Sequence, residues 1–388
     1  MSGGVRIAVA VVAATALAPA LLPASPAPPA SAAPATATAA ATAATATPAI
    51  RVVPVDSSYE TPTRAVSRDI GLSVALPDGH DLWVFGDTGT YVRAPKGAWK
   101  PSVFLSGSSA LEARDVRGAV PHGGEYPSGV PSRFIAEPAN VYLPGGTDRH
   151  CTDQTAAFPA RWPTGLAVMP TNPSDLLVTY SEVCVTRLPG GAPSIDTEGW
   201  GYLLFNWRTH HVDHGPVDVF RPKRNGKAIA DSLLFESPQF DNGRLVLFSS
   251  TCAAALVSCR TGTVWSTTVA LTTAALDNPA SYVPTTVATD DSQGWSPLSI
   301  SVARFPSGWR LVEATSIAGG YAIYSAATLA GPWHFLRSGT LPGCPSRVAF
   351  CFGLQSHPEL STATSLFLSY KDPDSGPGGH VVVSAVAD

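Results

Sequence analysis

The stretch Arg68–Thr88, RDIGLSVALPDGHDLWVFGDT, predicts a β-hairpin around which the rest of the chain is organised. Its turn is Pro77-Asp78-Gly79. Proline presets φ at the first turn position, aspartate tolerates the second, and glycine supplies a positive φ at the third. Such a composition is typical of a short hairpin loop with a β-bulge. The predicted register places Leu76 opposite His80.

The same register gives the hairpin one apolar face and one face that carries two acids. The apolar face consists of aliphatic side chains: Ile70, Leu72, Val74, Leu76, Leu82 and Val84. On the other face Asp69 lies directly opposite Asp87, at the open end of the hairpin. Opposed side chains have Cβ atoms about 4.5–5.5 Å apart, and two like charges at that distance cost energy. The pair therefore suggests a site that needs two carboxylates; the structural alternative is that Asp69 caps a loop and Asp87 binds turn amides.

Composition narrows the class of protein. The chain has 388 residues, of which 45% are hydrophobic and 14% are charged, against about a quarter charged in ordinary domains. The formal net charge of −4 gives no basic surface, so nucleic acid is not expected as a partner. Few charges together with many Gly, Pro, Thr and Ser residues are typical of a secreted β protein that is rich in loops.

The N-terminal segment has the features of a signal peptide. Arg6 gives a short positive region, Ile7–Leu22 is an apolar run, and Ala30-Ser31-Ala32 fits the small-residue cleavage rule. Residues 1–32 are therefore predicted to be removed, leaving a secreted protein without membrane contact; an uncleaved anchor is the alternative. Residues 33–49, almost wholly Ala, Thr and Pro, are predicted to form a flexible linker, and residues 50–388 the folded domain.

Six cysteines, an even number in a chain predicted to be exported, suggest three disulfide bonds. Two pairs share a spacing of seven residues and leave the third pair by elimination: Cys252–Cys259, Cys344–Cys351 and Cys151–Cys184. Other pairings remain open on sequence alone. A zinc site is the alternative, but the sequence has no CxxC motif, so no metal ligands are predicted.

After residue 50 the sequence shows short β runs separated by Gly, Pro, Asn and Asp, and no long run with helical periodicity. Five runs follow a turn: Asp81–Gly86, Asp175–Val185, Gly243–Ser250, Gly308–Thr315 and Ser365–Tyr370. Several have a matching run before them: Thr164–Met169, Phe235–Phe240, Ile300–Phe305 and Gln355–Leu360. One such hairpin cannot bury both of its faces, but a ring of five can. The sequence therefore predicts an all-β fold, a five-bladed β-propeller, with a pair of β-sandwiches as the alternative.

Acids recur at comparable points of these units. Beyond the two aspartates they are Glu182, Glu236, Glu313 and Glu359, with His357 beside the last and Glu137 before the second unit. An acid in an apolar strand is costly unless it faces water or a partner. Any one of them is more often a structural hydrogen-bonding group, but the set suggests one acidic pocket. Glycoside hydrolysis suits such a pocket, because it uses one protonated acid and one carboxylate, and crowded carboxylates separate in pKa.

Aromatic residues in the predicted loops would stack on sugar rings or pack in the core. They are Tyr91, Trp99, Trp162, Trp200 and Trp295. Hydrolysis by a serine nucleophile is not supported, because the sequence has no G-x-S-x-G motif.

The segment RDIGLSV…DGHDLWVFGDT resembles the N-terminal signature of secreted actinobacterial propellers grouped as domain of unknown function 4185. Members of that group are endo-D-arabinanases, which cut the arabinan of mycobacterial cell walls. The segments RWPTGLAV, GPWHF and HPELS…LFLSY are similar to this family and to five-bladed furanosidases and fructosidases. The resemblance implies that Asp69 and Asp87 are the catalytic pair. The chain departs from the family at RDIG, where a T-D-L-G type sequence is expected, and keeps the aspartate.

We therefore expect a secreted, monomeric glycoside hydrolase that acts on a furanose polymer, with mycobacterial-type cell-wall arabinan as its substrate. Asp69 and Asp87 are the expected acid and base or nucleophile, and Glu236 is the third catalytic candidate. The substrate-binding candidates are Arg68, Tyr91, Glu137, Glu182, His357 and Glu359. No cofactor is expected to be required, and a structural calcium ion near His357 is suggested by analogy. The alternative function is a non-catalytic carbohydrate-binding or cell-wall-adhesion propeller, which would need no close pair of acids.

Overall fold

The computed structural model describes residues 52–120, 122–138, 151, 157–186, 194–220, 235–252, 259–292, 294–344 and 351–388. The chain divides into two units, Met1–Ala46 and Thr47–Asp388, and every described residue lies in the second. The predicted signal peptide and linker therefore lie outside the described residues. Almost all regular structure in the described part is β, in strands β1–β24, with one short α-helix, α1 (Thr273–Leu276), and a short 3-10 helix, Pro279–Ser281.

The predicted hairpin is formed by β4 (Gly71–Ala75) and β5 (His80–Phe85). Its turn is closed by a hydrogen bond from the Leu76 N–H to the His80 carbonyl, and Gly79 has a φ of 86°. The register is the predicted one, because Val74 pairs with Leu82 and Leu72 with Val84. The aliphatic face is buried in a core that it shares with the next sheet.

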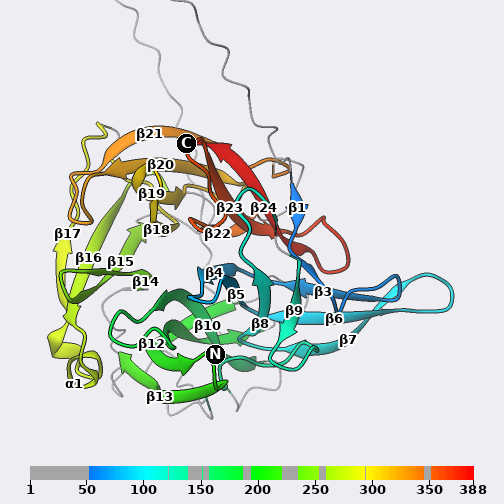
Figure 1. The fold of residues 1–388 in the computed structure, drawn as a ribbon. Coiled ribbons are helices and arrows are strands. Elements are labelled where there is room, and N and C mark those ends of the chain that lie inside the picture. The colour runs from blue at the N-terminus through cyan, green and yellow to red at the C-terminus, as the bar shows by residue number, and fades with distance from the viewer. Residues whose placement is uncertain are drawn as a thin grey trace, which may run out of the picture. The chain divides into compact units, whose positions relative to one another are not determined.

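The sequence suggested that the hairpin ends at the two aspartates, but in the structure it continues beyond them. Its strands continue as β3 (Arg64–Arg68) and β6 (Thr88–Arg93), and β7 (Trp99–Leu105) pairs with β6 to complete a three-stranded sheet. This sheet extends away from the other strands (Figure 1). The chain changes sheet at Asp69–Ile70, where Ile70 has a φ of 52°. Such a φ is uncommon for a β-branched residue, so a local constraint fixes the backbone beside the acid.

Five larger sheets make up the rest of the described structure (Figure 1). The first has the order β2 (Asp56–Ser57), β9 (His122–Tyr126), β8 (Ser109–Arg114), β5, β4. The second is β10 (Ala157–Val168), β11 (Asp175–Thr186), β12 (Ser194–Asn206), β13 (His211–Phe220). The third is β14 (Glu236–Asp241), β15 (Arg244–Cys252), β16 (Gly262–Ala270), β17 (Val283–Thr286).

The fourth sheet is β18 (Ser299–Phe305), β19 (Gly308–Ala314), β20 (Gly320–Ala326), β21 (His334–Thr340). The fifth is β22 (Phe352–Ser356), β23 (Ser365–Asp372), β24 (His380–Ala387), β1 (Val53–Pro54). The last strand of this sheet thus comes from the start of the described chain. The predicted strands agree with these elements except at Gln355–Leu360. There β22 ends at Ser356, because Pro358 has no N–H to donate to a sheet.

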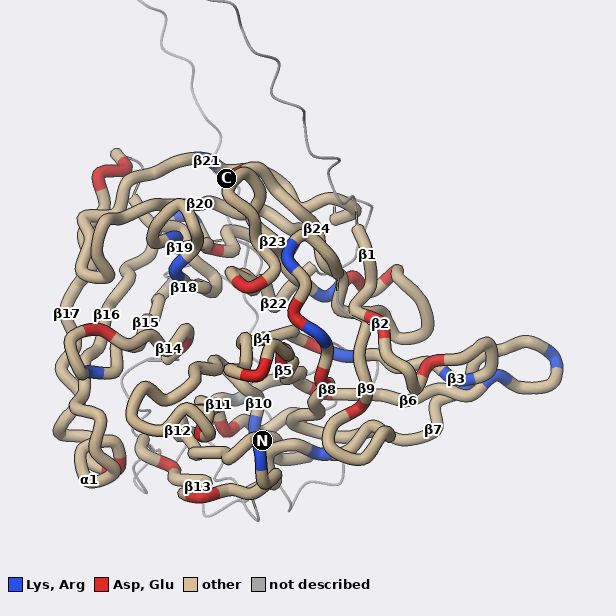
Figure 2. The backbone as a smooth tube through the Cα atoms, viewed as in Figure 1, with Lys and Arg blue, Asp and Glu red and all other residues tan. Residues whose placement is uncertain are grey.

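One edge strand of each of the five sheets contacts the edge strands of two other sheets, in a closed order. β4 contacts β10, β10 contacts β14, β14 contacts β18, β18 contacts β22, and β22 contacts β4. β10 and β14 can approach each other closely because residue 165 of β10 is glycine. Any Cβ at this position would overlap the Pro238 ring of β14. Large apolar clusters lie between neighbouring sheets, and charged residues are scattered over all five (Figure 2). We refer to these five as the inner strands.

Two of the predicted disulfide bonds are present, Cys151–Cys184 and Cys344–Cys351. Cys259 is also disulfide-bonded, while the side chain of Cys252 lies outside the described residues. In the part of the chain that the structure describes, no helix is long and apolar enough to cross a membrane.

Candidate active site

Asp69 and Asp87 are paired through their backbones, as the predicted register requires. The Asp69 N–H donates to the Asp87 carbonyl across 3.0 Å, and the Gly86 N–H donates to the Asp69 carbonyl across 2.5 Å. Their side chains, however, have different partners. The Asp69 carboxylate contacts Lys371 of β23, and the Asp87 carboxylate contacts Trp162 of β10. The two acids of one hairpin are therefore held by the sheets on either side of it.

Asp69 is the counterion of a buried lysine. Nζ of Lys371 lies 3.0 Å from Oδ1 of Asp69 and also donates to three oxygens of the surrounding chain. The lysine side chain is only 5% exposed, whereas that of Asp69 is 35% exposed. A buried ammonium group is costly without a negative partner. Asp69 therefore combines a fixed position with access to solvent.

Asp87 is held by two N–H donors. Oδ1 accepts a hydrogen bond of 2.7 Å from the Gly107 backbone and one of 2.9 Å from Nε1 of Trp162. Gly107 has a φ of 91°, and a Cβ there would lie 3.1 Å from the Arg161 carbonyl. Glycine is thus needed at this position to bring the donor to the carboxylate.

Next to Trp162, Arg161 lies at the centre of a buried polar network. Its guanidinium contacts Oε1 of Glu182 at 2.8 Å and Oδ1 of Asp218 at 3.2 Å, and Tyr180 donates to the same Asp218 oxygen. Burial, followed by the neighbouring Asp218, raises the pKa of Glu182 to about 7 despite the arginine. Glu182 was a substrate-binding candidate, but the structure places it in this buried network.

Glu236 is the first residue of β14 and half-buried. Its Oε2 accepts a hydrogen bond of 2.8 Å from the Ile300 N–H of β18. Burial raises the pKa of Glu236 to about 8, and the hydrogen bond from Ile300 lowers it by a smaller amount. At neutral pH this carboxyl group therefore carries a proton, unlike an ordinary glutamic acid.

These acids lie at one end of the inner strands. Asp69 comes just before β4, and Glu236 begins β14. Two pairs of inner strands start near one another, because Ile70 packs on Gly353 near the start of β22, and Glu236 accepts from Ile300 near the start of β18. We call this group, Asp69, Asp87 and Glu236, the acid cluster.

Glu359 and His357 lie at a different level of β4 from Asp69. Both follow the last residue of β22, and both contact the Ser73 hydroxyl in the middle of β4. Ser73 lies in the middle of β4, whereas Asp69 precedes the strand, on the other side of the backbone turn at Ile70. Glu359 therefore belongs to a different cavity of ≈ 440 Å³, lined by all five inner strands and by Asp115 and Arg117.

The remaining binding candidates have local contacts. Arg68 is 4% exposed, pairs with Glu125 and lies over the Phe85 ring, so it stabilises the first sheet. Glu137 pairs with Arg133 at 2.8 Å, and burial raises its pKa. Tyr91 lies on β6, half-buried, beside Gly378.

Among the aromatic candidates, Trp162 contacts the acid cluster. Trp200 and Trp295 are core residues, and Arg93 lies over the Trp99 ring. Lys371 and Gly107 were missed by sequence reasoning. Neither has a local signal, because Lys371 is some 300 residues from Asp69 in the chain and Gly107 resembles any turn glycine.

The calcium ion suggested near His357 stays a prediction. His357 is fully buried, with Nδ1 at 2.5 Å from the Ser73 hydroxyl and its ring stacked on Trp83. Calcium prefers several oxygen ligands. Within the described residues, the one group of three or more His, Cys, Asp or Glu side chains at metal-binding distances is Asp78, His80 and Glu112, which lies elsewhere.

No protein-family model and no curated protein matches this sequence. Among solved structures, the chain is similar to a protein from Bacteroides ovatus, at 14% identity and a TM-score of 0.49 over 82% of this chain and 85% of that one. It is similar to a family 117 glycoside hydrolase of the marine bacterium Zobellia galactanivorans, at 11% identity and a TM-score of 0.47 over 87% of this chain and 89% of that one.

A third similar structure is the GH43_1 enzyme from Xanthomonas citri complexed with xylose. It is 10% identical, with a TM-score of 0.44 over 87% of this chain and 90% of that one. Because all three TM-scores lie below 0.5, the chain's own residues must carry any functional argument.

Proposed function

We propose that this chain is a secreted glycoside hydrolase that cuts a furanose polymer, with cell-wall D-arabinan as its substrate. The observation that carries the proposal is the acid cluster. It combines a carboxylate paired with a buried lysine, a second held by two N–H donors, and a carboxyl group whose pKa is raised to about 8. A buried carboxyl group with a raised pKa is a candidate general acid, as in other glycoside hydrolases that use a carboxylic acid.

The cluster contains both groups that glycoside hydrolysis needs. Glu236, protonated at neutral pH, is the general acid that gives its proton to the leaving glycosidic oxygen. Asp69 is the carboxylate that activates water or attacks the sugar, because it is both fixed by Lys371 and open to solvent. Asp87, fixed by Gly107 and Trp162, completes the pocket as a second carboxylate.

A five-bladed β-propeller is the proposed architecture. The closed order of contacts among the five inner strands supports it, since two packed sandwiches would not join the first sheet to both the second and the fifth. The pairing of β1 with β24 supports it too, because a strand from the start of the domain completes the last sheet. In such a ring the ends of the inner strands converge on one site.

Secretion and the substrate are inferred from the sequence. The signal-like N-terminus and the disulfide bonds support export, and an exported monomer would meet cell-wall polysaccharide. D-Arabinan is proposed from the resemblance of RDIGLSV…DGHDLWVFGDT to the arabinanase family. A chain with few charged residues also suits a neutral polymer.

The test is digestion of purified mycobacterial arabinogalactan by the full chain, followed by mass spectrometry of released oligosaccharides. We expect arabinose oligosaccharides from the wild type and from Asp374→Asn, which changes an exposed acid on the β23–β24 loop. We expect none from Asp69→Asn or Glu236→Gln. Binding of the polymer without cleavage by any form would instead support a carbohydrate-binding propeller. Cleavage by both variants at the wild-type rate would refute the assigned residues.

A further inference from the structure

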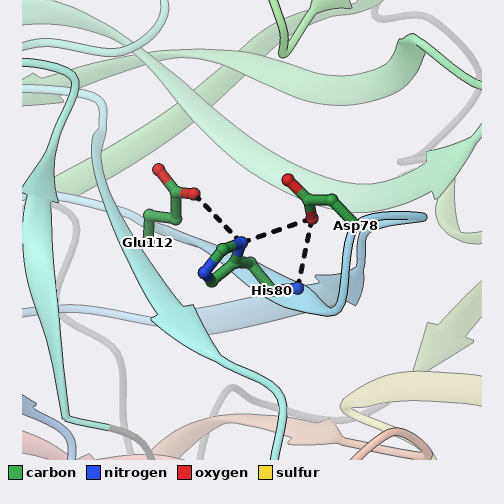
Figure 3. A group of neighbouring side chains, drawn as sticks. All are labelled: Asp78, His80 and Glu112. Carbon is green, nitrogen blue, oxygen red and sulfur yellow. Dashed lines mark hydrogen bonds and ion pairs between the residues drawn. The ribbon is translucent and has the colours of Figure 1, made fainter.

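A second group of ionisable side chains lies at the other end of β4, on the hairpin turn. Asp78 and His80 come from the turn and the start of β5, and Glu112 comes from β8 (Figure 3). The strand register brings them together. His80 pairs with Arg114 and Leu82 pairs with Glu112, so His80 and Glu112 are diagonal neighbours on one face of the sheet.

The His80 ring lies between the two carboxylates (Figure 3). Its Nδ1 is 3.4 Å from Oδ1 of Asp78 and 3.7 Å from Oε1 of Glu112. The three atoms all lie within 4.8 Å of one another. Nδ1 itself is buried and has no hydrogen-bond partner in the described part of the chain. One ring nitrogen and two carboxylate oxygens therefore lie close together, with the nitrogen at ion-pair distance from both oxygens but without a hydrogen bond.

We propose that Asp78, His80 and Glu112 bind a first-row divalent metal ion, with Zn²⁺ as the representative. Imidazole nitrogen and carboxylate oxygen are ligands that Zn²⁺ accepts at about 2.0–2.2 Å, which puts ligand atoms roughly 3–3.5 Å from each other. The distances of 3.4 Å and 3.7 Å are close to that spacing, so small side-chain rotations complete the site. The imidazole disfavours Ca²⁺ and Mg²⁺, and the lack of sulfur disfavours Cu⁺.

Part of the site is fixed before any ion binds. Oδ1 of Asp78 accepts the backbone N–H of His80 across 3.2 Å, so the turn itself holds the carboxylate beside the ring. Glu112 is anchored to the sheet through the pairing of β8 with β5. The ion would therefore join the hairpin turn to β8 and stabilise the first sheet. This proposal is independent of the proposed hydrolase function, because the turn lies at the opposite end of β4 from Asp69.

The alternative is that a protonated His80 makes two weak ion pairs. All three side chains are between 34% and 45% exposed, and ion pairs at such positions contribute little. His122 provides a matched control, because its Nδ1 lies 3.0 Å from Oδ2 of Asp56 at a more exposed position with one carboxylate in place of two. A metal site needs the third ligand; an ion pair does not.

The experiment is titration of the chelator-treated full chain with Zn²⁺, by calorimetry and by thermal unfolding. We expect one site that His80→Asn and Glu112→Gln each weaken by more than about tenfold, since even indirect supports of a metal change affinity by that much. Zn²⁺ should raise Tm in the wild type and in His122→Asn but not in His80→Asn. Any weak binding of Zn²⁺ at other histidines should be the same in the wild type and in all variants.

Two results would overturn the proposal. One is a wild-type protein that neither binds Zn²⁺ at a single site nor gains Tm from it. The other is a site that survives in both His80→Asn and Glu112→Gln. Glu112→Gln keeps the shape of the side chain, and circular dichroism of each variant confirms that lost binding reflects a lost ligand.

Discussion

Nε1 of Trp162 donates a hydrogen bond of 2.9 Å to Oδ1 of Asp87, and so β10 of the second sheet holds an acid that follows β5 of the first. A candidate catalytic carboxylate is thereby positioned by a residue of another sheet. This contact depends on one N–H group and can be removed without removing the ring.

Trp162→Phe keeps an aromatic side chain, although a smaller one, and deletes the donor to Asp87. We expect kcat on arabinan oligosaccharides to fall about tenfold or more, since loss of a hydrogen bond to a charged group is worth about 1.5–3 kcal/mol. KM should change less than kcat if Trp162 positions the acid, and the two should be compared directly. A KM that rises with kcat unchanged would instead mean that Trp162 contacts the sugar.

Asp69→Asn removes the charge opposite Lys371 and the proposed base or nucleophile. We expect activity to fall by at least about 100-fold, in line with the contribution of a positioned acid–base group. The buried ammonium of Lys371 loses its counterion, so Tm should fall as well. The double variant Asp69→Asn with Lys371→Met separates the effects, because it should recover part of the Tm loss but no activity. Recovered activity would contradict the catalytic role.

Glu236→Gln tests the general acid. In the wild type, kcat/KM should fall as pH rises through about 8, because the proton of Glu236 is lost there. The variant cannot donate a proton, so its rate on natural polymer should fall by about 100-fold or more and lose this alkaline limb. Aryl arabinofuranosides with acidic phenols need little help from an acid, and their hydrolysis should fall much less. Equal losses on both substrates would exclude a general-acid role.

Much of the fold was predictable from the hairpin because its signals are local. Pro77-Asp78-Gly79 determines the turn, and the turn determines which residue faces which. Repeated β runs likewise predict the strands of the five sheets. The continuation of the hairpin into β3 and β6 was not predictable, because it depends on the positive φ at Ile70, which packs against Gly353 of the fifth sheet. No sequence pattern near Ile70 reports that contact.

The candidate site was predictable only in part for the same reason. The backbone pairing of Asp69 and Asp87 follows from the register, but the directions of their side chains depend on Lys371 and Trp162, far away in the chain. The recurrence of acids in the repeated units did not indicate how far along its strand each acid lies. Glu236 begins an inner strand, whereas Glu359 follows one, and that difference separates them into two sites.

The last prediction concerns Asp81 of β5 and the way in which the stability of the fold depends on pH. Asp81 is fully buried, and neither carboxyl oxygen has a hydrogen-bond partner among the described residues. Burial, and then the charges of Glu359 and Asp115, raise its pKa from 3.8 to about 8. The folded state therefore keeps a proton that the unfolded state loses, so the Asp81 contribution to stability falls as pH rises between these two values.

Asp81→Asn has no proton to lose at this position. Its free energy of unfolding relative to the wild type should therefore increase with pH from about 4 to about 8 and then level off, by an amount on the order of 6 kcal/mol for a difference of about four pKa units. Urea unfolding at several pH values measures this difference directly. A flat difference for Asp81→Asn would mean that folding does not change the pKa of this carboxyl group, which would contradict the prediction.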